Sequence, residues 1–246
     1  MKFSIITCVL NNSKNIKKSM FSFQNQNFQN KEHIIIDGGS TDGTVNIIKK
    51  NKKKNIKLIS SSDKGIYDAL NKGLKISNGK IIGILHSDDF YENKFVLKNV
   101  FNAFKSSDAD LVYGDLLYIS KNFPYRKIRY WRAGEFFKNN LNNGWMPPHP
   151  AVFIKSTVLK KIGGYNLNYK ISSDYDFLLR ALSNKNIKKY YLPKTLVKMR
   201  IGGKSNNSLR NLMNKSLEDY QIIKKNNLGG IFTLFKKNYS KIRQFF

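Results

Sequence analysis

Acidic side chains are scarce in this chain, yet several of them follow apolar segments with the pattern of buried strands. Asp37 ends one such segment, Asp88 and Asp89 follow another, and Thr7 and Asn11 lie at the end of the first. Carboxylate oxygens are the ligands that Mg²⁺ and Mn²⁺ prefer, and these cations commonly bridge a protein to substrate phosphates. The Asp88–Asp89 pair could therefore hold a divalent cation against a diphosphate.

Each of these motifs also has a simpler structural interpretation. Asp88 and Asp89 could form the N-cap of a helix over residues 92–104. The segment 37–40, Asp-Gly-Gly-Ser, is also typical of an ordinary turn between a strand and a helix. Their chemistry depends on whether the fold brings them together.

The first half of the chain alternates strand and helix patterns. Apolar strands are expected at residues 3–9, 33–36, 56–60 and 81–85, and helices at 13–26, 44–48, 66–76 and 95–104. This alternation predicts an α/β fold with a Rossmann-like, mostly parallel sheet and helices on both faces. Because ligands bind at the carboxyl ends of such strands, the polar clusters should meet on one rim.

The pattern changes after about residue 115. Residues 116–119 and 126–131 predict a hairpin, 135–140 a helix, 151–154 a strand and 174–182 a further helix. A long polar helix is expected over residues 206–225, followed by a basic, aromatic tail over 230–246. The chain therefore divides into residues 1–115, a smaller α+β region over 116–205, and C-terminal helices over 206–246.

Composition narrows the class of protein. The chain has 246 residues, 41% of them hydrophobic, and a formal net charge of +28. One cysteine, Cys8, excludes a disulfide framework and a multi-cysteine zinc site. The absence of a secretory start and of an apolar run of about 18 residues predicts a cytoplasmic protein. The charge would suit nucleic acid, an anionic membrane or a phosphorylated substrate, although biased use of Asn and Lys would also produce it.

Six segments taken in order resemble one known family, the family 2 inverting glycosyltransferases with a GT-A fold. They are residues 4–12, 33–44, 63–73, 87–89, 173–180 and 199–205. The resemblance covers about residues 3–208. It implies transfer of a sugar from a nucleotide-diphosphate donor, with residues 1–115 as the nucleotide-sugar-binding half and 116–205 as the acceptor-side half.

The resemblance also implies roles for individual residues. Thr7, Asn11, Asp37 and Asp63 would line the nucleotide pocket, Asp88 would reach the ribose or a metal-bound water, and Asp89 would bind Mn²⁺ or Mg²⁺. Lys64 could add charge near the phosphates, and Arg200 could close over the diphosphate, although a surface lysine and a strand-end arginine are equally good interpretations. An Asp can accept a hydrogen bond from a base N–H and from ribose hydroxyls, which suits uracil or thymine and also guanine; among these donors a UDP-sugar is favoured.

The catalytic base implied by the alignment is Asp174. The family's usual pair is Glu-Asp, and this chain departs from it with Ser173, which leaves Asp176 as the alternative. At helical spacing the two carboxylates point about 200° apart, so only one of them can face the cleft. The Gln-x-x-Arg-Trp block of processive synthases is absent, so we expect one sugar to be added per encounter.

The tail and the charge leave alternatives open. Residues 230–246 could lie on an anionic membrane, where a lipid-diphosphate-linked glycan acceptor would be found, or could pack on the domain or stay disordered. A nucleotidyltransferase would usually carry a Gly-rich, basic loop after the first strand, where this chain has Asn11-Asn12-Ser13. A basic nucleic-acid-binding module would lack nucleotide-sugar binding, and no nucleic-acid-binding motif is present.

Overall fold

The computed structural model describes residues 1–202 and 209–242. Its first half contains four parallel strands: β1 (Phe3–Val9), β2 (Lys31–Asp37), β3 (Ile56–Ser60) and β4 (Ile81–Ile84). They lie in the order β3-β2-β1-β4, and β1 and β2 are fully in register from Phe3 opposite Lys31 to Val9 opposite Asp37. Their carboxyl ends therefore share one edge of the sheet, as the alternating pattern predicts.

The second half continues the same sheet with mixed strand directions. The sheet proceeds from β4 through β8 (Val152–Lys155), β6 (Leu111–Ile119) and β9 (Lys189–Arg200) to β5 (Phe90–Tyr91), and β7 (Lys127–Trp131) pairs with β6. β8 is antiparallel to both β4 and β6, whereas β9 is parallel to β6. Because β8 is antiparallel to both of its neighbours, β6 and β9 run in the same direction as β1 to β4, and the predicted mostly parallel sheet is confirmed. The antiparallel strands are β5, β7 and β8, and the predicted hairpin is β6 with β7.

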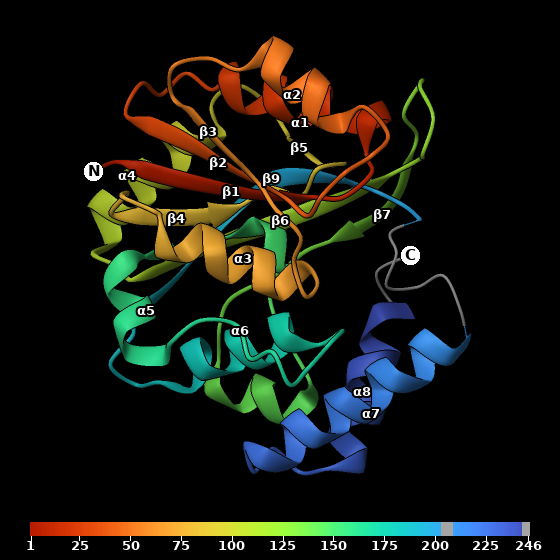
Figure 1. The fold of residues 1–246 in the computed structure, drawn as a ribbon. Coiled ribbons are helices and arrows are strands. Elements are labelled where there is room, and N and C mark those ends of the chain that lie inside the picture. The colour runs from red at the N-terminus through yellow and green to blue at the C-terminus, as the bar shows by residue number, and fades with distance from the viewer. Residues whose placement is uncertain (203–208, 243–246) are drawn as a thin grey trace.

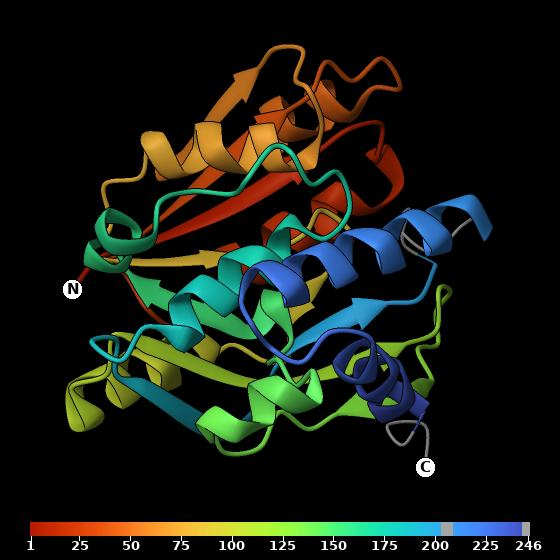
Figure 2. The same cartoon turned by 90° about the horizontal axis from the view of Figure 1, so that it is seen from below.

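Helices cover both faces of the sheet (Figures 1 and 2). The helices are α1 (Ser13–Gln24), α2 (Thr44–Asn51), α3 (Ile66–Lys75), α4 (Val96–Ser107), α5 (Ser156–Ile162) and α6 (Ser173–Ser183). Neighbouring strand residues point to opposite faces. Accordingly, Ile6 packs in the cluster with Leu70 of α3 and Leu178 of α6, and Ile5 packs with Phe23 of α1 and Phe104 of α4. All of these side chains are buried.

The C-terminal segment forms a pair of helices beside α6, α7 (Leu209–Lys225) and α8 (Ile231–Ile242). Lys237 of α8 is buried, lies 2.7 Å from Asp219 of α7, and stacks 3.2 Å from the ring centre of Tyr175 in α6. α8 also contacts the 3₁₀ turn over Lys138–Asn143, which stands where a helix was expected at 135–140. The described part of the tail is therefore a packed element of the fold.

No helix in the two described ranges combines the length and the apolar composition that crossing a bilayer requires.

Candidate active site at the carboxyl ends of the strands

The ends of β1 and β2 are joined by Asn11. Its side-chain Oδ1 accepts a hydrogen bond from the backbone amide of Thr41 (2.9 Å), and its backbone amide donates to Ser40 Oγ (2.8 Å). Asn11 has a φ of 51°, a left-handed conformation that asparagine tolerates better than most residues. The side chain predicted to contact the nucleotide thus also fixes the loop that follows β2.

Asp37 presents one free oxygen at this rim. Its Oδ2 accepts hydrogen bonds from the amides of Gly39 and Ser40 (both 3.1 Å) and from Ser60 Oγ (2.7 Å), whereas Oδ1 has no partner among the described residues. Burial opposes ionisation, but the hydrogen bonds from Ser40, Ser60 and Gly39 outweigh it and hold the pKa of Asp37 below its usual value. A charged, preoriented acceptor therefore stands at the end of β2.

Gly38 makes room for the carboxylate of Asp63. A Cβ at position 38 would lie 2.5 Å from Asp63 Oδ2, closer than real contacts allow. Asp63 Oδ1 accepts a hydrogen bond from the Gly65 amide at 2.9 Å, which fixes the carboxylate against the turn after β2. Lys64 is exposed, and its amide donates to Asp68 Oδ2 at 3.1 Å. Gly38 thus leaves room for the Asp63 carboxylate, which comes from the loop after β3.

Replacing Gly38 by alanine should weaken nucleoside-diphosphate binding by about tenfold, because the new methyl group displaces the Asp63 carboxylate. The measurement is a double-mutant cycle of dissociation constants with Asp63→Ala. In the Asp63→Ala background the new methyl group meets no carboxylate, so Gly38→Ala should then change the dissociation constant little. Additive effects of the two substitutions would contradict this coupling.

Thr7 is placed beneath the rim and does not line it. Its side chain is fully buried, with Oγ1 hydrogen-bonded to His33 Nε2 at 2.8 Å and donating to the Leu85 carbonyl at 2.6 Å. The predicted contact between this hydroxyl and the nucleotide is therefore corrected. Thr7 supports the rim by joining β1, β2 and the end of β4.

Asp89 carries an unpaired carboxylate oxygen in a buried position. The side chain is 1% exposed; Oδ1 accepts a hydrogen bond from the Arg200 amide at 3.4 Å, and Oδ2 has no partner in the described part of the chain. Burial, and next the charge of Asp88, raise the pKa of Asp89 well above its ordinary value. A cation would relieve both effects, because it attracts the charged form of the carboxyl.

The alternative role of Asp88 and Asp89 as a helix N-cap does not apply. β5 follows them directly, and α4 begins only at Val96, after Phe95 as its N-cap residue. Residues 1–202 and 209–242 hold no group of three His, Cys, Asp or Glu side chains that could bind a metal by themselves. A cation held at Asp89 would take its other ligands from a bound diphosphate and water.

Arg200 lies at the end of β9 beside the same site. Its guanidinium is nearly buried and donates to Asn15 Oδ1 and, at 2.9 Å, to Tyr125 Oη. It also lies over the rings of Phe90 and Tyr125, at 5.8 and 5.3 Å from their centres. These contacts hold the predicted diphosphate-binding residue against α1.

The first turn of α6 separates the two candidate bases. Asp176 is 2% exposed and forms a salt bridge with Arg180 Nε at 2.8 Å. Arg180 is bound in turn to the carbonyls of Ile162 and Gly164. Asp174 is half-buried, and its Oδ1 accepts hydrogen bonds from Tyr67 Oη (3.2 Å) and the Tyr175 amide (2.9 Å). Asp176 is thus engaged in a buried ion pair, whereas Asp174 is half-buried and accepts its hydrogen bonds at Oδ1.

Asp174 and the Asp88–Asp89 pair act electrostatically on two common neighbours, His86 and Tyr118. Burial lowers the pKa of the half-buried His86, while the charges of Asp88 and Asp174 both act in the opposite direction. Burial raises the pKa of Tyr118, and Asp89 and Asp174 both contribute to this rise. The carboxylates after β4 and in α6 therefore act on the same groups, although they are far apart in sequence.

Glu218 of α7 holds the loop that leads into Asp174. Its two carboxylate oxygens accept hydrogen bonds from the amides of Lys170 and Ile171 (both 2.9 Å) and Ser172 (2.8 Å). Ser172 is the N-cap residue of α6, and no side chain caps that helix. The sequence analysis did not find this residue, because no local pattern links position 218 to a loop 46 residues earlier.

Glu218→Ala should lower kcat about tenfold and leave donor affinity unchanged, since it frees the loop that positions Asp174. Three amides lose their acceptor, so stability should also fall by about 1–3 kcal/mol. Glu218→Gln, which keeps one acceptor oxygen, should restore part of kcat, and Gln221→Ala on the exposed side of α7 is the matched control. A loss of stability with an unchanged kcat would mean that Glu218 is purely structural.

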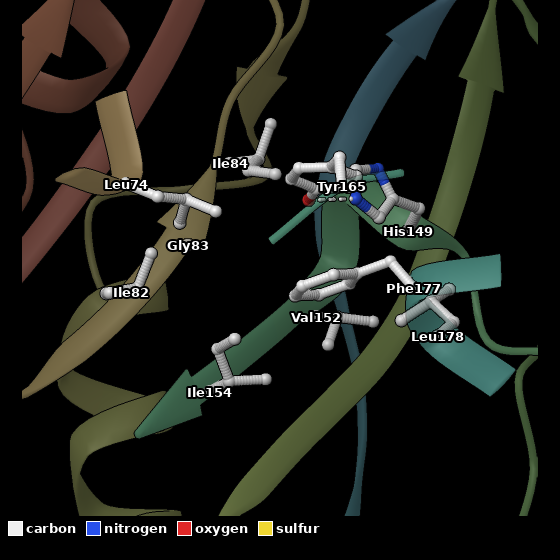
Figure 3. Close-up of a pocket in the computed structure, with 10 residues that line it drawn as sticks. All are labelled: Leu74, Ile82, Gly83, Ile84, His149, Val152, Ile154, Tyr165, Phe177 and Leu178. Atoms are coloured by element: carbon white, nitrogen blue, oxygen red, sulfur yellow. Dashed lines mark hydrogen bonds between the residues drawn. The ribbon is translucent and has the colours of Figure 1, made fainter. Parts of the chain in front are cut away.

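A cavity of about 20 Å³ lies below this rim, inside the core (Figure 3). Apolar side chains of β4, β8 and α6 line it, including Ile82, Val152 and Phe177. At one end His149 Nε2 and Tyr165 Oη are hydrogen-bonded at 2.8 Å, and burial lowers the pKa of His149 to about 4. A space of this size holds about one water molecule, so it is a packing defect and not a sugar pocket.

The fold is an α/β domain with carboxylates at the carboxyl ends of β2 and β4, and comparison with known proteins identifies the family. The family model described as "Glycosyl transferase family 2" matches residues 4–162. A "PGL/p-HBAD biosynthesis glycosyltransferase" of Mycobacterium bovis is 32% identical over 192 residues, which are 74% of this chain and 70% of that protein. A glycosyltransferase of Methanocaldococcus jannaschii is 28% identical over 222 residues, 86% of this chain and 74% of that protein.

Solved structures match the fold. S. aureus TarS (residues 1–349) in complex with UDP superposes with a TM-score of 0.71 and 20% identity, over 97% of this chain and 69% of that chain. The mannosyltransferase PcManGT from Pyrobaculum calidifontis, in complex with GDP-Man and Mn²⁺, gives 0.69 and 15%, with the same coverage. The chain belongs to glycosyl transferase family 2. It is a glycosyltransferase, and the GT-A-like fold expected from the sequence is confirmed.

Proposed function

We propose that this protein transfers a single sugar from a nucleotide-diphosphate sugar to a glycan or lipid-diphosphate-linked glycan, with inversion and with the help of Mn²⁺ or Mg²⁺. The observation that supports the proposal is the state of two carboxylates. Asp89 has a buried oxygen without a partner among the described residues, and Asp174 is half-buried and accepts a hydrogen bond from Tyr67. Asp89 is suited to hold a cation, and Asp174 is suited to accept a proton.

On the donor side, the free Oδ1 of Asp37 and the carboxylate of Asp63 are acceptors for a base N–H and for ribose hydroxyls. This pattern favours uracil, and TarS is a structural neighbour with bound UDP. Asp88 would reach the ribose, Lys64 would add positive charge near the phosphates, and Arg200 would close over the diphosphate. The basic surface of a chain with a net charge of +28 would attract this anionic donor.

Asp89 would hold the divalent cation, and Mn²⁺ is present in the complex of the structural neighbour PcManGT. When bound, such a cation neutralises the charge that develops on the departing diphosphate. Asp89 is buried and supported by the Arg200 amide, so its carboxylate is already oriented before a ligand arrives.

On the acceptor side, Asp174 would accept the proton of the attacking hydroxyl. The hydroxyl oxygen then forms the new bond to the anomeric carbon as the bond to the diphosphate breaks. Tyr67 and the Tyr175 amide bind only Oδ1, so these contacts leave Oδ2 for the acceptor. A single displacement of this kind inverts the anomeric centre.

The configuration of the product tests this function. We would incubate the protein with a UDP-sugar and Mn²⁺ and follow the anomeric proton by ¹H NMR, with water or an added glycan as acceptor. The first product should have the opposite anomeric configuration to the donor. A product that keeps the donor configuration would overturn the single displacement at Asp174.

A further inference from the structure

The exposed face of α8 is aromatic. Phe232, Phe235 and Tyr239 are spaced i, i+3 and i+7, which places them on one side of the helix, and they are 77, 72 and 51% exposed. α8 buries Leu234 in the core together with Thr233 and Lys237, which lie against the 3₁₀ turn and Asp219. A surface helix usually turns its large apolar side chains inward, whereas α8 leaves these aromatic rings in contact with solvent.

The charge around these rings is basic. Residues 209–242 contain seven Lys and Arg residues and two acids. Both acids are used internally, because Glu218 accepts three backbone amides and Asp219 pairs with Lys237. Lys236 lies on the aromatic face, where it donates to Asn143, and Lys224 and Lys225 are exposed at the end of α7. The exposed charge of this helical pair is therefore positive.

We infer that the outer face of α8, formed by Phe232, Phe235, Lys236 and Tyr239, binds an anionic membrane surface. Aromatic rings partition to the boundary between lipid headgroups and acyl chains, and neighbouring lysines add attraction to anionic lipids. A protein partner or a second copy would need no net positive charge around the rings, whereas an anionic bilayer matches both features.

The position of this face connects it to the reaction. Lys237, on the inner side of the same helix, stacks on Tyr175, the residue after Asp174, and the charge of Asp174 acts on Lys237. A membrane bound to α8 would thus lie against a helix that packs on the first turn of α6, which carries Asp174. This connection rests on the proposed function, because it supplies a lipid-linked acceptor to that base, but membrane binding itself does not depend on it.

The test is co-sedimentation of the full chain with vesicles, in the absence of any sugar donor. We expect binding to vesicles of phosphatidylcholine and phosphatidylglycerol in equal parts, weak binding to pure phosphatidylcholine, and a decrease with added salt. Phe232→Ser/Phe235→Ser should reduce binding at least about tenfold, because it removes two rings from the interface. The matched control, Phe21→Ser/Phe95→Ser, removes two rings that are 40 and 42% exposed on α1 and before α4 and should bind like the wild type.

A second variant keeps the test independent of the aromatic substitutions. Lys224→Glu/Lys225→Glu should weaken binding to the anionic vesicles while all rings remain. Equal binding by wild type and Phe232→Ser/Phe235→Ser would overturn the inference. So would a concentration-dependent dimer in analytical ultracentrifugation that disappears in this variant, since the face would then be an interface between copies. Nucleoside-diphosphate binding measured on the same samples reports separately on the proposed function.

Discussion

Asp174→Asn is expected to lower sugar transfer by at least about 10²-fold while leaving donor affinity unchanged. Asparagine has the same shape and can still accept hydrogen bonds from Tyr67 and from the Tyr175 amide through Oδ1. It cannot take the proton of the acceptor hydroxyl. The measurement is the rate of nucleoside-diphosphate release from the donor, together with the dissociation constant of the nucleoside diphosphate.

The matched control for this prediction is Asp176→Asn, the same substitution two residues further on. Asp176 pairs with Arg180 in a buried position, so its loss should destabilise the fold and lower the melting temperature. The rate per folded molecule should stay close to that of the wild type. Near-normal transfer in Asp174→Asn combined with a loss in Asp176→Asn would move the role of base to Asp176.

Asp89→Asn is expected to abolish the increase in donor binding that Mn²⁺ produces, and with it the activity. The buried carboxyl has a raised pKa, and asparagine resembles its protonated form, so the cation-free fold should be preserved. The amide carries no charge to hold a divalent cation in a buried site. The measurement is calorimetric titration of the nucleoside diphosphate with and without Mn²⁺, with circular dichroism as the check on folding.

Asp88→Asn distinguishes the metal ligand from its neighbour. Asp88 is half-buried and is proposed to reach the ribose, so its substitution should weaken donor binding to a similar extent with and without Mn²⁺. The ratio between the two conditions should remain that of the wild type. Full Mn²⁺ dependence in Asp89→Asn would refute the assignment of the metal to Asp89.

The donor half of the site follows from the sequence because parallel strands bring their ends to one edge. The patterns of residues 3–9, 33–36 and 81–85 define the strands, and the loops after them are then neighbours. The hydrogen bonds from the Thr41 amide to Asn11 and from the Asn12 side chain to Ser87 confirm this expectation. The orientation of the Thr7 hydroxyl does not follow from the sequence. It is hydrogen-bonded inward to His33, and no residue spacing indicates this contact.

The acceptor half depends on contacts between distant segments, and there the sequence is less informative. Helical spacing predicts that one of Asp174 and Asp176 faces the cleft, but it takes Arg180 and the carbonyls of residues 162 and 164 to show which. No local sequence pattern predicts the hydrogen bond that Glu218 accepts from the Ser172 amide at the start of α6. The same is true of the antiparallel strand β8, whose place between β4 and β6 is set by packing.

Calorimetric titration of the wild-type protein with UDP, dTDP, GDP and CDP, each with and without Mn²⁺, decides whether the carboxylate rim binds a nucleoside diphosphate. We expect tight binding of UDP that requires Mn²⁺. A random oligonucleotide is the control for the charge of the chain. Binding of the oligonucleotide alone, weakening as salt is added, would refute the proposed donor site, because the basic surface and not the carboxylate rim would then be the binding site.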